Sequence, residues 1–220
     1  MLLDSLLVAH IAVLGYWLGS ELVINSTYRY VSYHGEMPFA HRDRLMAHVM
    51  NVDQHVRYAL VLQAGLGTTL GLRLGYLPGG EGLAVVAGVI TVAWLVFVEA
   101  VHRLRQAAIG ARLGAVDRGI RYALMALLVG IWSMAIAGNL DLQPWLAWKL
   151  LCFAGVMACG VGIRLWIMKF FRVWKEVEHE GSSAAQEQLI QKIYVRSTSV
   201  LVGLWLFIGA IVILSVWKPS

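Results

Sequence analysis

Three residues in the first apolar stretch have side chains that could bind a cofactor. His10, Trp17 and Glu21 lie within residues 2–24, which are otherwise almost wholly apolar. Steps of seven and eleven residues return to nearly the same direction on an α-helix, so these side chains share one side. An ionisable residue inside a membrane span is costly and generally faces the bundle interior, where it marks a site. We therefore expect His10 to ligate haem iron or another metal, with Trp17 and Glu21 lining the pocket; interhelical hydrogen bonding by His10 is the alternative.

A second group of histidines is expected near the opposite membrane face. His48 and His55 lie on one stripe of a predicted helix at 42–58, which runs along the interface into the next span. His102 follows Glu99 by about one helical turn at the end of another span. Imidazole binds transition metals and exchanges protons near neutral pH. The group could hold a second haem or a metal ion, or exchange protons with a quinol or porphyrin; histidines that only meet lipid headgroups are the alternative.

Lys149 is the third candidate, near the outer end of an apolar run at 145–168. It is predicted at a depth similar to that of His10. A haem packed among helices needs an imidazole for its iron and cations for its propionates. The two residues could supply one of each, although a lysine at this position could also simply extend its amine to the interface.

Other chemistries are not supported by the pattern. Glu99-x-x-His102 resembles half of a di-iron carboxylate motif, but such a site needs a second copy and further glutamates. The sequence contains neither a phosphate-binding loop nor a Gly-x-Ser-x-Gly nucleophile motif. Cys152 and Cys159 lie on one predicted helix at a spacing that no disulfide can bridge. They are expected to be buried free thiols, with a copper site that includes Met157 as the alternative.

The composition places these residues in a membrane. The chain has 220 residues, of which 59% are hydrophobic and only 14% are charged. A soluble domain carries about 25% charged residues. So much apolar surface cannot be hidden in one water-soluble core, and the partner it requires is a lipid bilayer. The net charge of +5 does not indicate a nucleic-acid partner, because the basic residues lie between apolar runs.

Six apolar runs are each long enough to cross a bilayer, given about 20 residues per crossing. They are residues 2–24, 56–76, 83–101, 122–138, 145–168 and 199–217. Lys and Arg are concentrated in the first, third and fifth connections, so the positive-inside rule places those connections in the cytoplasm and both termini outside it. The predicted fold is an all-α helical bundle that forms a single transmembrane domain over residues 1–220.

Two connections are predicted to contain further helices. Residues 169–198 include the only soluble-looking stretch and are expected to form a cytoplasmic helix–turn–helix linker. A short interfacial helix is expected at about 106–117. Glycines at four-residue spacing, which allow close helix packing, form two ridges: Gly15 and Gly19, and Gly67, Gly71 and Gly75.

Short motifs resemble one family, the bacterial membrane protoporphyrinogen IX oxidases of the HemJ type. The first is His10, Trp17, Gly19 and Arg29, similar to that family's first helix with its essential histidine. Arg42-Asp43-Arg44-Leu45 resembles the family's basic helix start, Trp145-Leu146-x-x-Lys149-Leu150 resembles a later helix whose lysine is functionally important, and Lys218-Pro219 resembles its ending. Related copper-resistance D-like membrane proteins share the general helix plan.

The chain also departs from that family. The family has about four spans, so the runs at 83–101 and 122–138 look like an insertion. Its histidine in the later helix is Ala147 here, and its Asn-Glu-x-Pro sequence before the last helix is replaced by residues 196–199. The motifs cover about half of the chain. The resemblance therefore implies the helix plan and a haem-side role for His10 more directly than it implies the family's reaction.

The sequence and the resemblance lead to one functional hypothesis, with two alternatives. The protein is expected to be a redox protein that binds one or two b-type haems between its first, second and fifth spans, and acts on a porphyrinogen or a quinone. In that case Lys149 and Glu21 are the candidate catalytic residues, while His55 and His102 serve a second cofactor or proton exchange. The alternatives are an accessory subunit of a larger membrane complex or a homo-oligomer, and a copper-handling protein.

Overall fold

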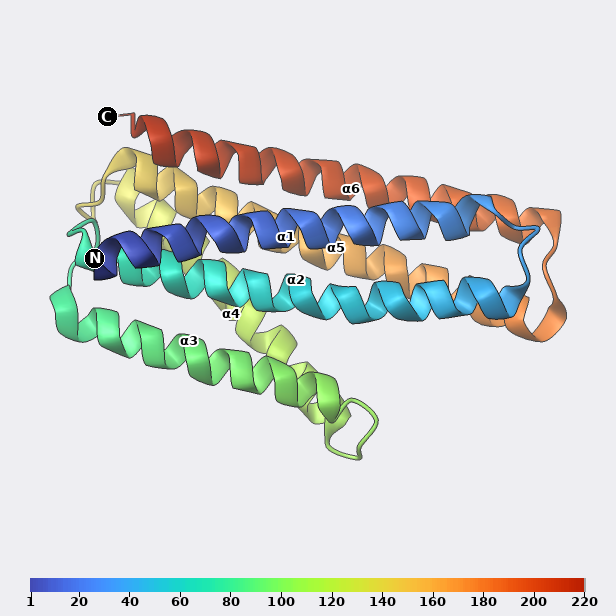
Figure 1. Ribbon diagram of the computed structural model, residues 1–220. Coiled ribbons are helices and arrows are strands. Elements are labelled where there is room, and N and C mark those ends of the chain that lie inside the picture. The colour runs from blue at the N-terminus through green and yellow to red at the C-terminus, as the bar shows by residue number, and fades with distance from the viewer. Residues whose placement is uncertain (220) are drawn as a thin grey trace. The chain divides into compact units, whose positions relative to one another are not determined.

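A computed structural model describes residues 1–219 of the chain, and it is all-α (Figure 1). The six helices are α1 (Leu2–Tyr33), α2 (Phe39–Arg73), α3 (Gly80–Arg103), α4 (Gly110–Ile136), α5 (Pro144–Glu180) and α6 (Ala184–Trp217). Each predicted apolar run lies largely within one of these helices. The all-α class predicted from the sequence is therefore confirmed.

Five of the helices are long and apolar enough to cross a membrane: α1, α3, α4, α5 and α6. The chain is thus a multi-pass membrane protein by the length and composition of its helices. α2 is not among the five, because even its apolar second half contains Arg57, Gln63, two threonines and Arg73. The sixth span and the side on which each terminus lies stay predictions.

The helices extend well beyond the predicted spans. α5 has 37 residues, which corresponds to about 55 Å of helix against a hydrocarbon core of about 30 Å. The predicted helix–turn–helix linker is confirmed, but its helices are continuations of α5 and α6 rather than separate elements. Gly181 makes the turn between them with a φ of 84°. Ser183 then begins α6 with a capping box, in which it and Gln186 satisfy each other's backbone N–H groups.

The helix predicted at 42–58 is present as the first half of the continuous helix α2, and its position along the interface stays a prediction. One local prediction is corrected. No short helix spans 106–117: the chain turns there, and α4 begins at Gly110. A side chain at residue 110 would meet the backbone carbonyl of Leu104 at 2.4 Å, so glycine permits this tight turn.

The glycine ridges behave differently from one another. A Cβ at Gly15 or Gly19 would meet no atom of the described chain within 4 Å, so the first ridge makes no close packing within residues 1–219. Gly67 does contact a neighbouring helix, as described below. Gly75 is not a packing residue, because it lies beyond the end of α2 with a φ of 75°. Its role is the left-handed residue that ends a helix.

The described chain divides into two compact units. The first contains Met1–Ile24 and Met50–Arg121, and the second contains Asn25–Val49 and the chain from Tyr122 onward. Within the second unit, α5 and α6 form a long antiparallel pair (Figure 1). Glycines allow their close approach, because a Cβ at Gly155 would meet the Phe207 ring at 2.8 Å and one at Gly162 would meet Val200 at 3.2 Å.

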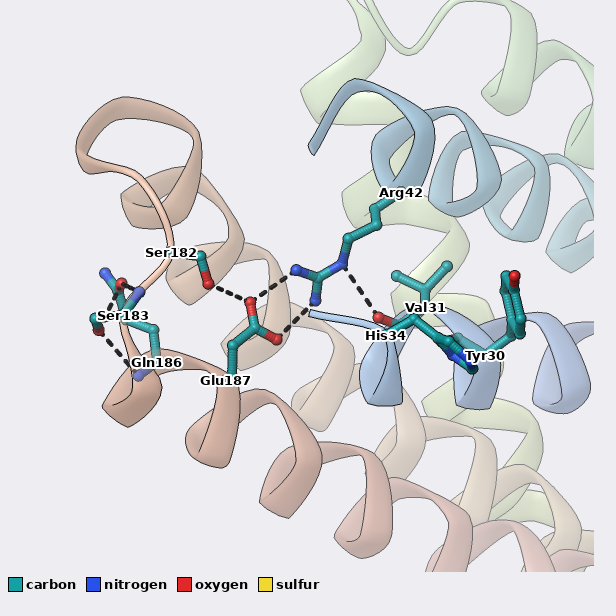
Figure 2. Close-up of polar contacts among 8 residues, drawn as sticks. All are labelled: Tyr30, Val31, His34, Arg42, Ser182, Ser183, Gln186 and Glu187. Carbon is teal, nitrogen blue, oxygen red and sulfur yellow. Dashed lines mark hydrogen bonds and ion pairs between the residues drawn. The ribbon is translucent and has the colours of Figure 1, made fainter. Parts of the chain in front are cut away.

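A buried ion pair fixes the end of the second unit where α1 and α2 meet α6 (Figure 2). Arg42 is 1% exposed, and its guanidinium donates to both carboxylate oxygens of Glu187 at 2.7 and 2.9 Å. Its Nε donates to the Val31 carbonyl at 3.2 Å. The guanidinium also lies 5.0 Å from the ring centre of Trp174, whose Nε1 donates to Asp43 at 3.0 Å. The arginine is thus paired on every side, as a buried charge requires.

Candidate functional site

His10 lies on α1 against α2 in the first unit. The Gln63 side chain donates to the backbone carbonyl of His10 at 2.8 Å, which fixes the two helices at this level. The imidazole is half-buried, and a Cβ built at Gly67 would lie 3.4 Å from its Cε1 and 3.9 Å from its Nε2. The His10 ring thus packs against α2 at Gly67, where a methyl group would make an ordinary van der Waals contact and a longer side chain would meet the ring.

Trp17 and Glu21 are both buried, with 3% and 6% of their surface exposed. They lie one turn apart on α1, and Trp17 Nε1 donates to the Glu21 carboxyl at 3.3 Å. Their predicted location on an interior side of the first helix is consistent with this burial. Burying a carboxyl group in an apolar helix costs free energy, and this cost makes Glu21 a candidate for binding a ligand or transferring a proton.

His55 is exposed on α2 and pairs with a residue that the sequence analysis did not single out. Its Nδ1 shares a 2.5 Å hydrogen bond with the Tyr16 hydroxyl of α1. The two rings meet edge to face, with centroids 5.9 Å apart. Either partner of such a bond can carry the proton, depending on the histidine tautomer. The pair can therefore hold and exchange a proton at one position.

Tyr58 continues this arrangement toward α3. Its ring lies 6.1 Å from that of His55, again edge to face. The Tyr58 hydroxyl donates a short hydrogen bond to Glu99, and the Arg103 guanidinium pairs with the same carboxylate. We call Tyr16, His55, Tyr58 and Glu99 the tyrosine–histidine–glutamate cluster. It brings together three proton-bearing side-chain types from α1, α2 and α3.

The remaining candidates lie outside this cluster. His102 is half-buried in the last turn of α3, in the first unit. His48 is exposed on α2 and belongs to the second unit, as does Lys149 on α5. Lys149 is half-buried, and within residues 1–219 it makes neither a hydrogen bond nor an ion pair. Cys152 and Cys159 are free thiols, half-buried rather than fully buried.

His10 is of a residue type that fits a haem. Haem iron can be held by one axial imidazole, and the His10 ring is half-buried beside Gly67. Across residues 1–219, no three His, Cys, Asp or Glu side chains gather in one place. Metal binding by His10, His48, His55 and His102 stays a prediction.

The sequence analysis missed Tyr16 and Tyr58, although both carry a signal. Tyr58 follows His55 by three residues and so lies on the same helical stripe. Tyr58 and Glu99 are also about equally far from the connection between α2 and α3, so an antiparallel hairpin brings them level with each other. The same reasoning pairs Tyr16 with His55 across the connection between α1 and α2. The distance of each residue from the connection between two antiparallel helices would therefore have predicted both pairs.

Comparisons with known proteins do not extend this picture. No family model matches the chain, and neither a curated protein nor a solved structure is similar to it.

Proposed function

We propose that the protein is a redox protein of the bacterial inner membrane that holds b-type haem through His10. The proposed substrate is a hydrogen-carrying small molecule, a quinol or a porphyrinogen, whose protons are exchanged at the tyrosine–histidine–glutamate cluster. The resemblance to the membrane protoporphyrinogen oxidases supports this reading through His10, Trp17 and Lys149.

The observation that carries the proposal is the cluster itself. Oxidation of a quinol or a porphyrinogen releases protons together with electrons, so the site needs groups that take protons near neutral pH. Imidazole is the side-chain group best suited to this exchange, and the cluster contains one in His55. Tyr16 on His55 and Tyr58 on Glu99 give two hydrogen-bonded pairs at the level where α1, α2 and α3 meet.

The chain's own residues have separate roles in this proposal. A bound haem supplies one-electron transfer. His10 binds it, Gly67 allows the imidazole its position, and Glu21 with Trp17 forms a polar wall of the pocket. Lys149 belongs to the second unit and keeps the role that the resemblance implies, recognition of an acidic group on haem or substrate.

The test is a reduced-minus-oxidised visible spectrum of the purified full chain, with a pyridine haemochrome assay for the amount of haem. The proposal expects at least one b-type haem per chain in the wild type and its loss in His10→Ala. His41→Ala is the matched control, because His41 is exposed on α2 and is not a proposed ligand. A folded wild-type protein without haem would refute the proposal, and bound copper in its place would favour the copper-handling alternative.

A non-catalytic membrane subunit is the second candidate function. One observation favours it: Gly15 and Gly19 lie on α1 with open space where their side chains would be. Such a glycine face suits the approach of another transmembrane helix, from a second copy or a different subunit. In this case His10→Ala would leave the spectrum unchanged, whereas Gly15→Leu would reduce assembly in a crosslinking assay.

A further inference from the structure

A cleft between α5 and α6 lies apart from the residues discussed so far. It has a volume of about 660 Å³ and lies wholly within the second unit. Trp166, Lys169 and Arg172 line it from α5, and Lys192 and Arg196 line it from α6. The proposed redox function makes no use of it.

The cleft has a strong excess of positive charge. Four cations line it against a single carboxylate, that of Glu176. Across residues 1–219, none of the four cations forms an ion pair with a carboxylate. This contrasts with Arg42 nearby in the same unit, which is fully paired. Four unpaired cations that converge on one cleft are suited to an anion with several oxygens, since arginine and phosphate form bidentate hydrogen bonds.

The cleft is also placed at the level where two predicted spans end. The run at 145–168 ends one residue before Lys169, and the run at 199–217 begins three residues after Arg196. Trp166 is of the residue type that favours the membrane interface, and the Lys169 amine lies 4.3 Å above its ring centre. Leu189 and Ile193 add an apolar wall. A ligand here would meet positive charge on one side and apolar surface on the other.

We propose that this cleft binds the phosphate of an anionic phospholipid, with the headgroup among the four cations and the acyl chains directed along α5 and α6. The bare chemistry, a phosphate held by Lys and Arg, would also suit a free phosphorylated molecule. The predicted membrane level and the apolar wall favour the lipid. Basic clefts between transmembrane helices on the cytoplasmic side are a known setting for lipid headgroups.

The test is native mass spectrometry of the full chain in detergent, titrated separately with phosphatidylglycerol, phosphatidylcholine and glycerol 3-phosphate. The proposal expects phosphatidylglycerol to bind most tightly. The variant Arg172→Gln/Arg196→Gln should weaken that binding by roughly thirtyfold, about fivefold for each cation removed. Lys175→Gln/Arg105→Gln is the matched control, because it removes two exposed cations that do not line the cleft.

Three results would overturn the proposal. Equal binding of phosphatidylglycerol and phosphatidylcholine would show that the cleft does not distinguish lipids by the charge of the headgroup. An equal loss in the control variant would show general attraction to a basic protein rather than a site. Binding of glycerol 3-phosphate as tight as that of the lipid, and lost in the same variant, would assign the cleft to a free phosphorylated molecule. All substitutions are at exposed positions, so a thermal melt is expected to show an unchanged fold.

Discussion

Gly67 lies beside the His10 ring, so a long side chain at this position would meet the imidazole. A methyl group there would lie 3.4 Å from Cε1 of the ring, an ordinary van der Waals contact. A larger side chain cannot be accommodated, so Gly67→Leu is expected to turn the imidazole away. If His10 binds haem, this variant should lose or shift the Soret band although the ligand itself is unchanged. Gly15→Leu on the same helix as His10 is the control, since it has open space and should keep the spectrum.

The tyrosine–histidine–glutamate cluster predicts an effect on rate without an effect on haem. Tyr58→Phe removes the proton that the hydroxyl donates to Glu99 while keeping the ring beside His55. General acid–base groups contribute about 10²–10⁴-fold to rate. We expect quinol-driven haem reduction in stopped flow to slow by at least about tenfold, with an unchanged absorption spectrum. Tyr30→Phe serves as the control, because Tyr30 is exposed and lies outside the cluster; an equal rate in both variants would exclude proton exchange at Tyr58.

What the sequence could predict at this scale depends on the kind of residue. His10, Glu21 and Lys149 can be named as candidates from the sequence, because an ionisable group in an apolar run is conspicuous. The tyrosines were not, because a tyrosine in a membrane helix is common and gains meaning only from its partner. The partners of Tyr16 and Tyr58 lie 39 and 41 residues away, and helical periodicity relates only residues a few turns apart.

At the scale of the elements, the apolar runs were predicted but the helix ends were not. The hydropathy of a sequence indicates which part of a helix can lie in lipid. The helix itself continues beyond that part, until a capping residue such as Gly181 or Ser183 ends its backbone hydrogen bonding. From hydropathy alone, the charged stretches that flank the predicted spans are therefore interpreted as loops or separate helices. They are in fact further turns of α2, α5 and α6.

The contact between α2 and α3 yields an element-scale prediction. A Cβ at Gly65 would lie 2.0 Å from the Thr91 hydroxyl oxygen and 2.7 Å from its Cβ. Gly65→Ala should therefore push the helices apart and destabilise the protein by about 1–3 kcal/mol. The double variant Gly65→Ala/Thr91→Gly removes the obstructing side chain and should recover most of the loss in a thermal melt. If Gly65→Ala melts like the wild type, the close approach of these helices is not required.

At the scale of the whole molecule, the Arg42–Glu187 pair predicts sensitivity to acid. Glu187 lies in the predicted cytoplasmic linker, twelve residues before the run at 199–217. Burial raises the pKa of its carboxyl, but the hydrogen bonds from Arg42 and Ser182 and the charge of Arg42 outweigh this and leave the pKa below its ordinary value of 4.5. A carboxyl whose pKa is depressed on folding stabilises the folded state above its unfolded-state pKa, and this stability is lost as the pH falls through the folded-state pKa.

The measurement is the thermal midpoint of the full chain in detergent, followed from neutral pH down through 4.5. The wild type should lose stability below that value. Glu187→Gln should be less stable at neutral pH by about 1.5–3 kcal/mol, the size of a hydrogen bond to a charged group, and its midpoint should fall less in acid. Glu178→Gln is the control, because Glu178 is exposed on α5. Identical acid profiles for the wild type and Glu187→Gln would show that another group controls the loss.

The same pair has a consequence for how the chain is made. Arg42 and Glu187 are 145 residues apart, so at about 5–20 residues per second the ribosome delivers the carboxylate about 7–30 s after the guanidinium. During this interval the Arg42 guanidinium lacks its carboxylate partner and has to remain in water or among lipid headgroups. The second unit draws on both early and late parts of the chain, and it can close only after the start of α6 has emerged. Insertion of the hairpin formed by α5 and α6 thus completes the second unit, whose earlier segments were inserted before it.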